Sequence, residues 1–259
     1  LMITYIPHLD YSCQKHGPNH PEVDADLEIA DQLMGRFISA LKNEGKYDDA
    51  AFCIFSEYAL SAVNGAVMIN QVLRNAGYLK VRTIAGREYL DCEMSRAFAM
   101  VDHQVAHVYV NNDQDIGAVR NLLEKTDGVA SVLGESEQND FRILHERSGE
   151  LVAVSDEDKW FAYYWWDSLD AAPDFASHID IHRKPGYDPV ELFMNQETFE
   201  IPQEPERIKG SHGAPPRPGI EGRPQRAVFM LSGRGTDAIA LPEYMRTVDT
   251  TAILKQLTK

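Results

Sequence analysis

Side chains that could bind a cation are concentrated in three loops of this 259-residue chain. Asp10 lies in the first loop, Glu57 in the second, and His212 in the third, within the sequence Gly-Ser-His-Gly at 210–213. Glycine on either side of this short segment leaves the backbone free to turn sharply, so the imidazole could point into a cleft. Taken alone, the tetrad is equally compatible with a surface turn that happens to contain histidine.

Carboxylates and imidazoles are the usual protein ligands of zinc and similar divalent ions, and a catalytic site leaves one position open for water or substrate. Because the three loops are distant in sequence, no spacing rule can identify such a site, and solvated loop residues are the alternative interpretation. The chain has 25 Lys and Arg against 40 Asp and Glu, a formal charge of −15. An anionic substrate would need this negative field cancelled, and a bound metal ion is the usual means.

The same acidic composition argues against a nucleic-acid-binding protein, since no local basic patch offsets it. The cysteines Cys13, Cys53 and Cys92 are odd in number and form no CxxC pair, which argues against a disulfide framework and a thiolate zinc site. We therefore expect a reducing, cytoplasmic compartment. No apolar run approaches the roughly 20 residues that span a bilayer. The chain opens on what resembles a strand already under way, so we expect a fragment of a longer protein, in which a signal peptide would not be visible.

The first 96 residues alternate between strand and helix patterns. Residues 2–6 predict a strand that ends at Pro7, and the loop that follows, 7–18, is rich in possible ligands. A helix is predicted over 21–43, because apolar residues recur at every fourth position and form one face. These residues are Ile29, Leu33, Phe37 and Leu41.

A second strand is predicted at 50–56, where apolar residues do not alternate with polar ones. Such a run is typical of a strand buried on both faces of a parallel sheet. A helix over 67–76 with Gly77 as its C-cap follows the loop that contains Glu57. Asp10 and Glu57 thus both follow predicted strands, and loops at the carboxyl ends of strands are where open α/β sheets bind ligands.

Residues 97–166 predict a small α+β insert between two parts of the α/β core, 1–96 and 167–259. Its predicted helix spans 115–125, and its strands are short. The predicted strands cover 106–110, 128–133, 141–144, 151–155 and 160–166. All three tryptophans lie in the last of these, either as a packed strand or as an aromatic wall over a ligand.

The second core part begins with a long, mostly irregular connection at 167–209, and such connections are often functional. A Pro-rich stretch at 215–219, a core strand at 227–233 and a helix through Ile253, Leu254 and Leu257 complete the chain.

The order of these blocks resembles the type I phosphodiesterase/nucleotide pyrophosphatase branch of the alkaline phosphatase superfamily, in its C-terminal portion. The matching blocks are Pro-x-x-Asp at 7–10, Ser-Glu-Tyr at 56–58, the Gly-Ser-His-Gly tetrad and the terminal Thr-Val-Asp-Thr-Thr-Ala-Ile-Leu at 247–254. Segments 99–110 and 182–193 are also similar to that branch. The resemblance implies an alkaline-phosphatase-like three-layer α/β core with a mainly parallel sheet and a small α+β cap that selects the substrate.

The resemblance also implies a two-metal hydrolase of phosphodiester or nucleotide pyrophosphate bonds in a small phosphorylated or nucleotide-like substrate. The implied cofactors are divalent ions, zinc first, with manganese or magnesium as alternatives. Asp10 and His212 match ligands of one metal, whereas Gln14 stands where the family has histidine, with His16 two residues further on. At the second metal, Glu57 replaces an aspartate.

Tyr58 stands where the family has the histidine of this second metal, and tyrosine, with a reference pKa of about 10, is a poor zinc ligand at neutral pH. The family's nucleophilic Thr or Ser is expected upstream of Leu1, so no catalytic nucleophile is identified in this chain. Three outcomes follow from the altered blocks: a site retuned to harder ions, a single-metal site, or an inactive relative that binds a ligand without turnover. A binding module without metal is the interpretation if the resemblance is accidental.

Other residues could substitute for the missing ligands or bind the substrate. His103 and His182, each near an aspartate, are candidate ligands or substrate contacts, and hydrogen-bonded structural histidines are the alternative. Arg183 and Lys184 are candidates for gripping a phosphate, since arginine makes bidentate contacts, although a solvated surface pair fits equally well.

Overall fold

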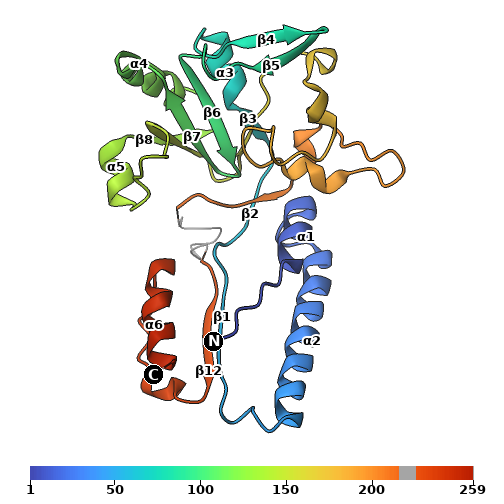
Figure 1. Ribbon diagram of the computed structural model, residues 1–259, viewed down its shortest axis with the longest axis vertical. Helices are drawn as coiled ribbons and strands as arrows, with labels where there is room; N and C mark the ends of the chain where they lie inside the picture. The colour runs from blue at the N-terminus through green and yellow to red at the C-terminus, as the bar shows by residue number, and fades with distance from the viewer. Residues whose placement is uncertain (216–225, 259) are drawn as a thin grey trace. The chain divides into compact units, whose positions relative to one another are not determined.

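The computed structural model describes residues 1–215 and 226–258, which form two compact units (Figure 1). Unit 1 comprises Leu1–Ser12, His20–Ala59 and Pro218–Lys259, and unit 2 comprises Cys13–Asn19 and Leu60–Arg217. Apart from Pro215, the predicted Pro-rich stretch at 215–219 lies outside the described residues. No helix in the described part of the chain is long and apolar enough to cross a membrane.

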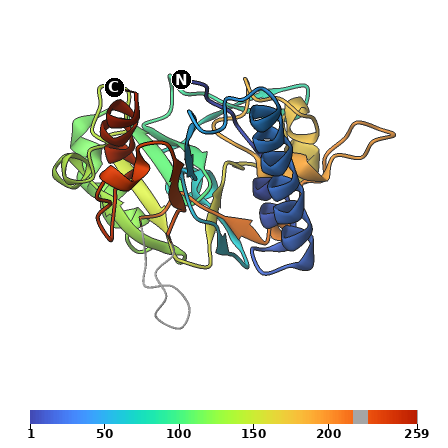
Figure 2. The ribbon, with the colours of Figure 1, turned by 90° about the horizontal axis from the view of Figure 1, so that it is seen from below.

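Unit 1 is built around two strands, β1 (Ala51–Phe55) and β12 (Phe229–Gly233), which pair antiparallel. Two helices, α2 (Pro21–Asn43) and α6 (Thr250–Leu257), lie on opposite sides of this pair (Figure 2). Two short 3-10 turns, Thr236–Ala238 and Thr247–Asp249, connect β12 to α6.

The helix α2 has the bounds that its apolar repeat predicts. Pro21 occupies the first turn, where its missing N–H costs no hydrogen bond, and the His20 side chain accepts a hydrogen bond from the Glu22 backbone N–H at 3.2 Å. On the predicted apolar face, the Phe37 ring meets the ring of Phe52 in β1 edge-on, 6.3 Å between centroids. This aromatic contact ties the helix to the strand pair.

Two predictions for the start of the chain are wrong. Residues 1–7 form no strand, and most of the predicted ligand-rich loop is the helix α1 (His8–His16), which continues into unit 2. A strand needs a neighbour to satisfy its backbone hydrogen bonds, and an apolar pattern does not specify that neighbour. Leu1 and Ile3 are accordingly 87% and 84% exposed.

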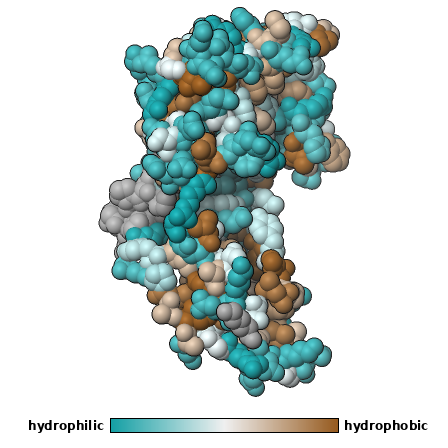
Figure 3. Space-filling view, turned by 60° about the vertical axis from the view of Figure 1, so that its left-hand side comes forward, coloured by the Kyte–Doolittle hydropathy of each residue, from teal (hydrophilic) through white to brown (hydrophobic). Residues whose placement is uncertain are grey.

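The strand predicted at 50–56 exists as β1, but it is neither parallel nor buried on both faces. Ile54 and Phe55 are 39% and 44% exposed, and hydrophobic side chains reach the surface of unit 1 (Figure 3). Its partner β12, predicted as a core strand, also contains no fully buried residue. Apolar runs in both strands gave the same sequence signal as a buried parallel sheet, because that signal does not distinguish the pairing direction.

Unit 2 contains a four-stranded antiparallel sheet in the order β6–β7–β9–β8. The strands are β6 (Ala97–Asp102), β7 (Val105–Val110), β9 (Leu151–Ser155) and β8 (Val129–Leu133). The helix α3 (Ile69–Asn75) packs on β6, and α4 (Asp113–Leu123) packs on β7, β8 and β9. Alternate residues of β6 and β7 point into one core with the apolar faces of both helices.

Three short strand pairs surround this sheet. β2 (Ser61–Ala62) pairs antiparallel with β11 (Gly210–Ser211), and β4 (Val81–Ile84) with β5 (Arg87–Leu90). β3 (Ala66–Met68) and β10 (Trp160–Ala162) form the one parallel pair among the described strands. The mixed α/β class is thus confirmed, while strand pairing in the described residues is mainly antiparallel.

Most elements predicted for unit 2 are present, with two exceptions, whereas the strands β4, β5 and β6 were not predicted. Strand 151–155 has its predicted bounds, and the helix predicted at 115–125 begins and ends two residues earlier. Val67, predicted in a helix, lies in β3, and residues 141–144, predicted as a strand, follow the short helix α5 (Glu135–Asp140) as turns. Both exceptions are short apolar runs, for which helix and strand signals overlap.

The tryptophans pack in the core of unit 2, which favours the packing interpretation over the aromatic wall. Trp160, Trp165 and Trp166 are 1%, 1% and 4% exposed. The strand ends at Ala162 rather than at 166, but the residues after it remain buried.

The connection at 167–209 is irregular, as predicted, apart from short 3-10 turns. These turns cover Leu169–Ala171, Asp174–Ser177, Pro189–Phe193 and Pro205–Arg207. The division into core parts 1–96 and 167–259 and a cap at 97–166 stays a prediction.

Candidate functional site

The Gly-Ser-His-Gly tetrad is held in place in unit 2 by contacts that require glycine. A Cβ on Gly210 would lie 2.1 Å from the carbonyl oxygen of Cys13, so only glycine allows this approach to α1. The neighbouring Lys209 N–H donates to the Gln14 carbonyl at 2.8 Å, and Gly213 adopts φ +102°. The predicted turn is therefore a fixed segment rather than a free surface loop.

His212 lies against a second histidine, His103, from the turn between β6 and β7. Their ring centroids are 3.8 Å apart with an interplanar angle of 34°. The Gln104 N–H donates to the His212 carbonyl at 2.8 Å, and the Ser211 hydroxyl lies 3.4 Å from His103 Nδ1. Burial lowers the pKa of His103 to about 3, with the His212 charge as the smaller cause, so this ring is neutral at pH 7.

Tyr187 connects this histidine pair to Gln14. Its ring lies 4.7 Å from the His103 ring, and its hydroxyl donates to Gln14 Oε1 at 3.4 Å. Tyr187 reaches this position because Gly186, with φ +116°, lets the chain approach Val101 in β6. Gln14 itself is fully buried.

The structure thus brings together, in unit 2, three residues that were singled out in the sequence: Gln14, His103 and His212. His16, two residues after Gln14, is exposed at the end of α1. Tyr187 and Ser211 complete the cluster; both lie in segments that were singled out in the sequence, but neither residue was predicted as a site residue. Contacts between residues so distant in the chain depend on the fold and leave no local pattern in the sequence.

A second cluster, in unit 1, contains Asp10, Glu57 and Tyr58. Asp10 lies in the first turn of α1, and Glu57 follows the end of β1. The pKa of Tyr58 is raised chiefly by burial and then by the negative charge of Asp10, which also accepts a hydrogen bond from the Tyr58 hydroxyl. Glu57 contributes a smaller effect in the same direction, so both carboxylates lie near this hydroxyl.

The donor chemistry of these residues fits a divalent ion with oxygen ligands better than two zinc ions. Asp10 and Glu57 offer carboxylate oxygens, which are donors that magnesium and manganese accept. Tyr58 does not replace a histidine ligand, because its hydroxyl is protonated and hydrogen-bonded to Asp10. Among the described residues, no group of three or more His, Cys, Asp and Glu is close enough to hold a metal ion. A joint metal centre with His212 stays a prediction.

The predicted phosphate-gripping residues make ion pairs within unit 2. Lys184 is 4% exposed, and its Nζ lies 2.9 Å from Asp188 and 2.6 Å from Glu191. Arg183 Nε lies 2.5 Å from Asp180, and a further ion pair joins this arginine to Asp174.

His182 is exposed in the same segment, and its backbone N–H donates to Asp180. The positive charges of Arg183 and Lys184 are thus balanced by nearby carboxylates rather than presented to solvent alone.

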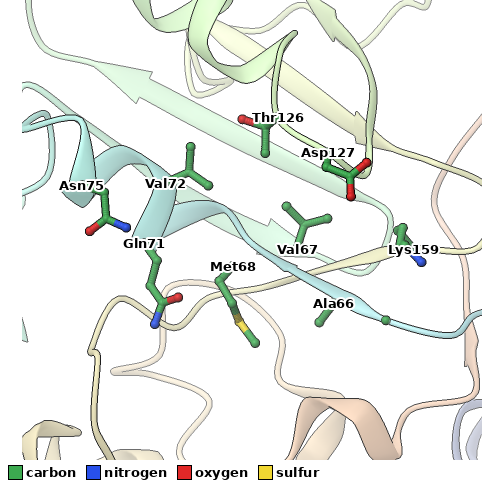
Figure 4. A pocket seen from close by; sticks show the side chains of 10 residues that line it. Ala66, Val67, Met68, Gln71, Val72, Asn75, Thr126, Asp127 and Lys159 are labelled. Carbon is green, nitrogen blue, oxygen red and sulfur yellow. The ribbon is translucent and has the colours of Figure 1, made fainter.

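A separate open groove of about 340 Å³ lies between β3, α3 and the turn after α4 (Figure 4). Val67, Met68 and Val72 line it with apolar atoms, and Asp127 and Lys159 lie at its edge. None of the residues predicted for the site lines this groove.

Comparisons with known proteins confirm the resemblance seen in the sequence. The profile of the type I phosphodiesterase / nucleotide pyrophosphatase family matches residues 1–188. No curated protein sequence gives a significant match.

Two solved structures show the same fold. Phosphonoacetate hydrolase from Sinorhizobium meliloti 1021, in complex with phosphonoacetate, is 17% identical with a TM-score of 0.50, covering 96% of this chain and 49% of its own. Murine ectonucleotide pyrophosphatase/phosphodiesterase 5, an inactive variant in complex with AMP, is 15% identical with a TM-score of 0.56, at 96% and 51% coverage. The chain therefore spans about half the length of these structures.

Proposed function

Because the chain belongs to the type I phosphodiesterase / nucleotide pyrophosphatase family, we propose that it hydrolyses phosphodiester or nucleotide pyrophosphate bonds in a small phosphorylated substrate. The observation that carries this proposal is the hydrogen bond from the Tyr58 hydroxyl to the Asp10 carboxylate, which brings Asp10 to the chain segment that contains Glu57. These carboxylates come from different elements, and they match two blocks that the family uses for chemistry. The phosphonoacetate and AMP complexes of the similar structures are compatible with this substrate class.

We propose that Asp10 and Glu57 of unit 1 bind a divalent ion through carboxylate oxygens. As a separate proposal, the His212 imidazole of unit 2 is a metal ligand. Such an ion, when bound, supplies positive charge that stabilises the developing charge on a phosphoryl oxygen. The oxygen-rich donor set favours manganese or magnesium over zinc. The Tyr58 hydroxyl restrains the Asp10 carboxylate by donating a hydrogen bond to it, which orients the free carboxylate oxygen.

The proposal is tested with protein that has been stripped by a chelator and then supplied with Mn²⁺, Mg²⁺ or Zn²⁺. Hydrolysis of bis(p-nitrophenyl) phosphate and of a nitrophenyl nucleotide ester should be lost on stripping and restored best by Mn²⁺ or Mg²⁺. We expect Asp10→Asn and Glu57→Gln to lower kcat/KM by on the order of 100-fold, because each removes a charged ligand. The matched controls are Asp31→Asn and Glu28→Gln, which alter exposed residues of α2.

A binding protein without turnover is the second candidate, because Gln14 and Tyr58 stand where the family has histidines and both are hydrogen-bonded within the protein. If the chain is such a binding protein, calorimetry should show that AMP or a divalent ion binds, while both nitrophenyl esters remain intact. Protein that contains no metal by elemental analysis and hydrolyses neither ester would rule out the proposed enzyme.

A further inference from the structure

The turn between β6 and β7 places a histidine where glycine is the favoured residue. Asp102 pairs with Val105 across the two strands, which leaves His103 and Gln104 as a two-residue hairpin turn. His103, the first of the two, has φ +58°, in the left-handed region that is costly for a residue with a side chain. A strained residue of this kind is kept only when the surrounding structure determines it.

The His103 side chain contacts the tetrad rather than solvent. It is 5% exposed, and its ring stacks on the His212 ring with 3.8 Å between centroids. The His103 ring also contacts the Tyr187 ring, with 4.7 Å between the centroids and 31° between the ring planes. The strained turn thus supplies a ring that packs directly on the best-matched candidate ligand.

The backbone of the turn is anchored as firmly as the ring. His103 accepts a hydrogen bond from the Phe161 N–H at 2.7 Å, and Gln104 donates to the His212 carbonyl at 2.8 Å. The Gln104 side chain donates to the carbonyls of Glu157 and Lys159 at 3.0 and 3.1 Å. Main chain and side chain of His212 are therefore both held by one fixed hairpin turn.

We propose that His103 is a positioning residue that fixes the orientation of the His212 imidazole by ring stacking. The part that His212 plays in binding rests on the proposed function. Groups that orient a metal-binding histidine typically change metal affinity by about 10–100-fold when they are removed. The contact that carries this role is the one between the two rings, whose centroids lie 3.8 Å apart.

The turn allows a test in which the ring is lost and the fold is kept. In His103→Gly the backbone adopts φ +58° without strain, so this variant should fold at least as well as the wild type. His103→Asn also tolerates the left-handed region but lacks the ring. His103→Phe keeps a stacking ring, and His145→Gly removes an exposed histidine of unit 2 as the matched control.

The first readout is the ¹⁵N spectrum of histidine-labelled protein, in which the His212 signals are assigned by their absence in His212→Ala. We expect His103→Gly and His103→Asn to shift or broaden the His212 signals, and His103→Phe and His145→Gly to leave them nearly unchanged. The second readout is the Mn²⁺ and Zn²⁺ affinity by calorimetry, which should fall by about 10-fold or more in the Gly and Asn variants.

His212 signals unchanged in His103→Gly, together with metal affinities within twofold of the wild type, would overturn the inference. Signals that change equally in His103→Phe would overturn the stacking role as well. Failure of the proposed function has a different signature: His212→Ala would then leave metal affinity and hydrolysis unaltered, while the ring signals would still report whether His103 positions His212.

Discussion

At position 103, a titratable but neutral imidazole is buried between the rings of Tyr187 and His212, and this burial couples folding to pH. The pKa of His103 is lowered to about 3 by burial and by the neighbouring His212 charge, whereas an unfolded histidine titrates near about 6.5. Between these values the unfolded chain binds more protons, so stability is complete above about pH 6.5 and falls as the pH drops towards 3.

The wild type should lose unfolding free energy between pH 7 and pH 5, because the unfolded chain takes up a proton at His103. We predict that this loss is smaller in His103→Asn by about 2 kcal/mol. Urea unfolding followed by tryptophan fluorescence measures this for unit 2, since all three tryptophans are buried there. Contributions from groups that are distant from residue 103 are present in both proteins and cancel in the difference. An equal pH dependence in wild type and His103→Asn would show that burial does not lower the pKa of His103 in the folded state.

Gly210 provides a test of the close approach between the tetrad and α1. We predict that Gly210→Ala destabilises unit 2 by about 1–3 kcal/mol, because the new Cβ would lie 2.1 Å from the Cys13 carbonyl oxygen and force the backbone apart. Gly117→Ala is the matched control: no atom lies within 4 Å of its Cβ, and in the helix α4 alanine should stabilise by roughly 0.5–1 kcal/mol. A Gly210→Ala protein as stable as the control would contradict the close packing.

At the scale of the elements, the irregular segment after residue 183 is stabilised by the buried ammonium group of Lys184. Lys184 pairs with Asp188 and Glu191, and the Asp188 side chain also accepts a hydrogen bond from the Val190 N–H at the start of a 3-10 turn. We predict that Lys184→Met destabilises unit 2 by about 3–5 kcal/mol, because it leaves the buried Asp188 without its counter-charge.

The matched control for this change is Lys125→Met, at an exposed position after α4, which should alter stability by less than about 0.5 kcal/mol. Chemical denaturation of both variants measures the difference. If Lys184→Met costs no more than the control, Lys184 is available for another partner, and its assignment as a phosphate contact regains support.

Helices with a regular apolar repeat were predictable from the sequence, whereas strand pairing, which depends on a segment distant in the chain, was not. The four-residue apolar repeat and Pro21 specify α2, and the apolar pattern of 113–123 specifies α4 within two residues. The apolar run at 2–6 has the same texture as a strand but forms none, and the run at 51–55 pairs antiparallel. Pairing is decided by which segment lies alongside, and a local pattern does not contain that information.

The candidate site shows the same limit. The order of the sequence blocks predicts Asp10, Glu57 and His212 as site residues. The family match covers the blocks of Asp10 and Glu57 within residues 1–188, and the roles of all three residues stay predictions. The resemblance also implies that Gln14 and Tyr58 stand in place of histidines. The contacts of the site residues were not predictable: the hydrogen bond from Tyr58 to Asp10 and the packing of His103 on His212 depend on the fold, and His103 has a positive φ that no sequence pattern indicated.

For the molecule as a whole, the two units should differ in local stability. In unit 2, β7 is hydrogen-bonded on both sides and its alternate residues are fully buried, as are most residues of β9. In unit 1, β1 pairs with β12 alone among the described strands, and Ile54 and Phe55 remain exposed. Backbone amides exchange with solvent through local opening, so few buried contacts mean low protection.

We predict by hydrogen exchange and mass spectrometry that amides of β7 and β9 exchange at least about 100-fold more slowly than those of β1 and β12. If Asp10 and Glu57 bind a divalent ion as proposed, adding Mn²⁺ should slow exchange around α1 and the end of β1 in the wild type but not in Glu57→Gln. The ion stabilises only the folded arrangement of its ligands, so the effect should be confined to the segments that carry them. Uniform protection across both units would contradict the first expectation, and an equal Mn²⁺ effect in Glu57→Gln would contradict the second.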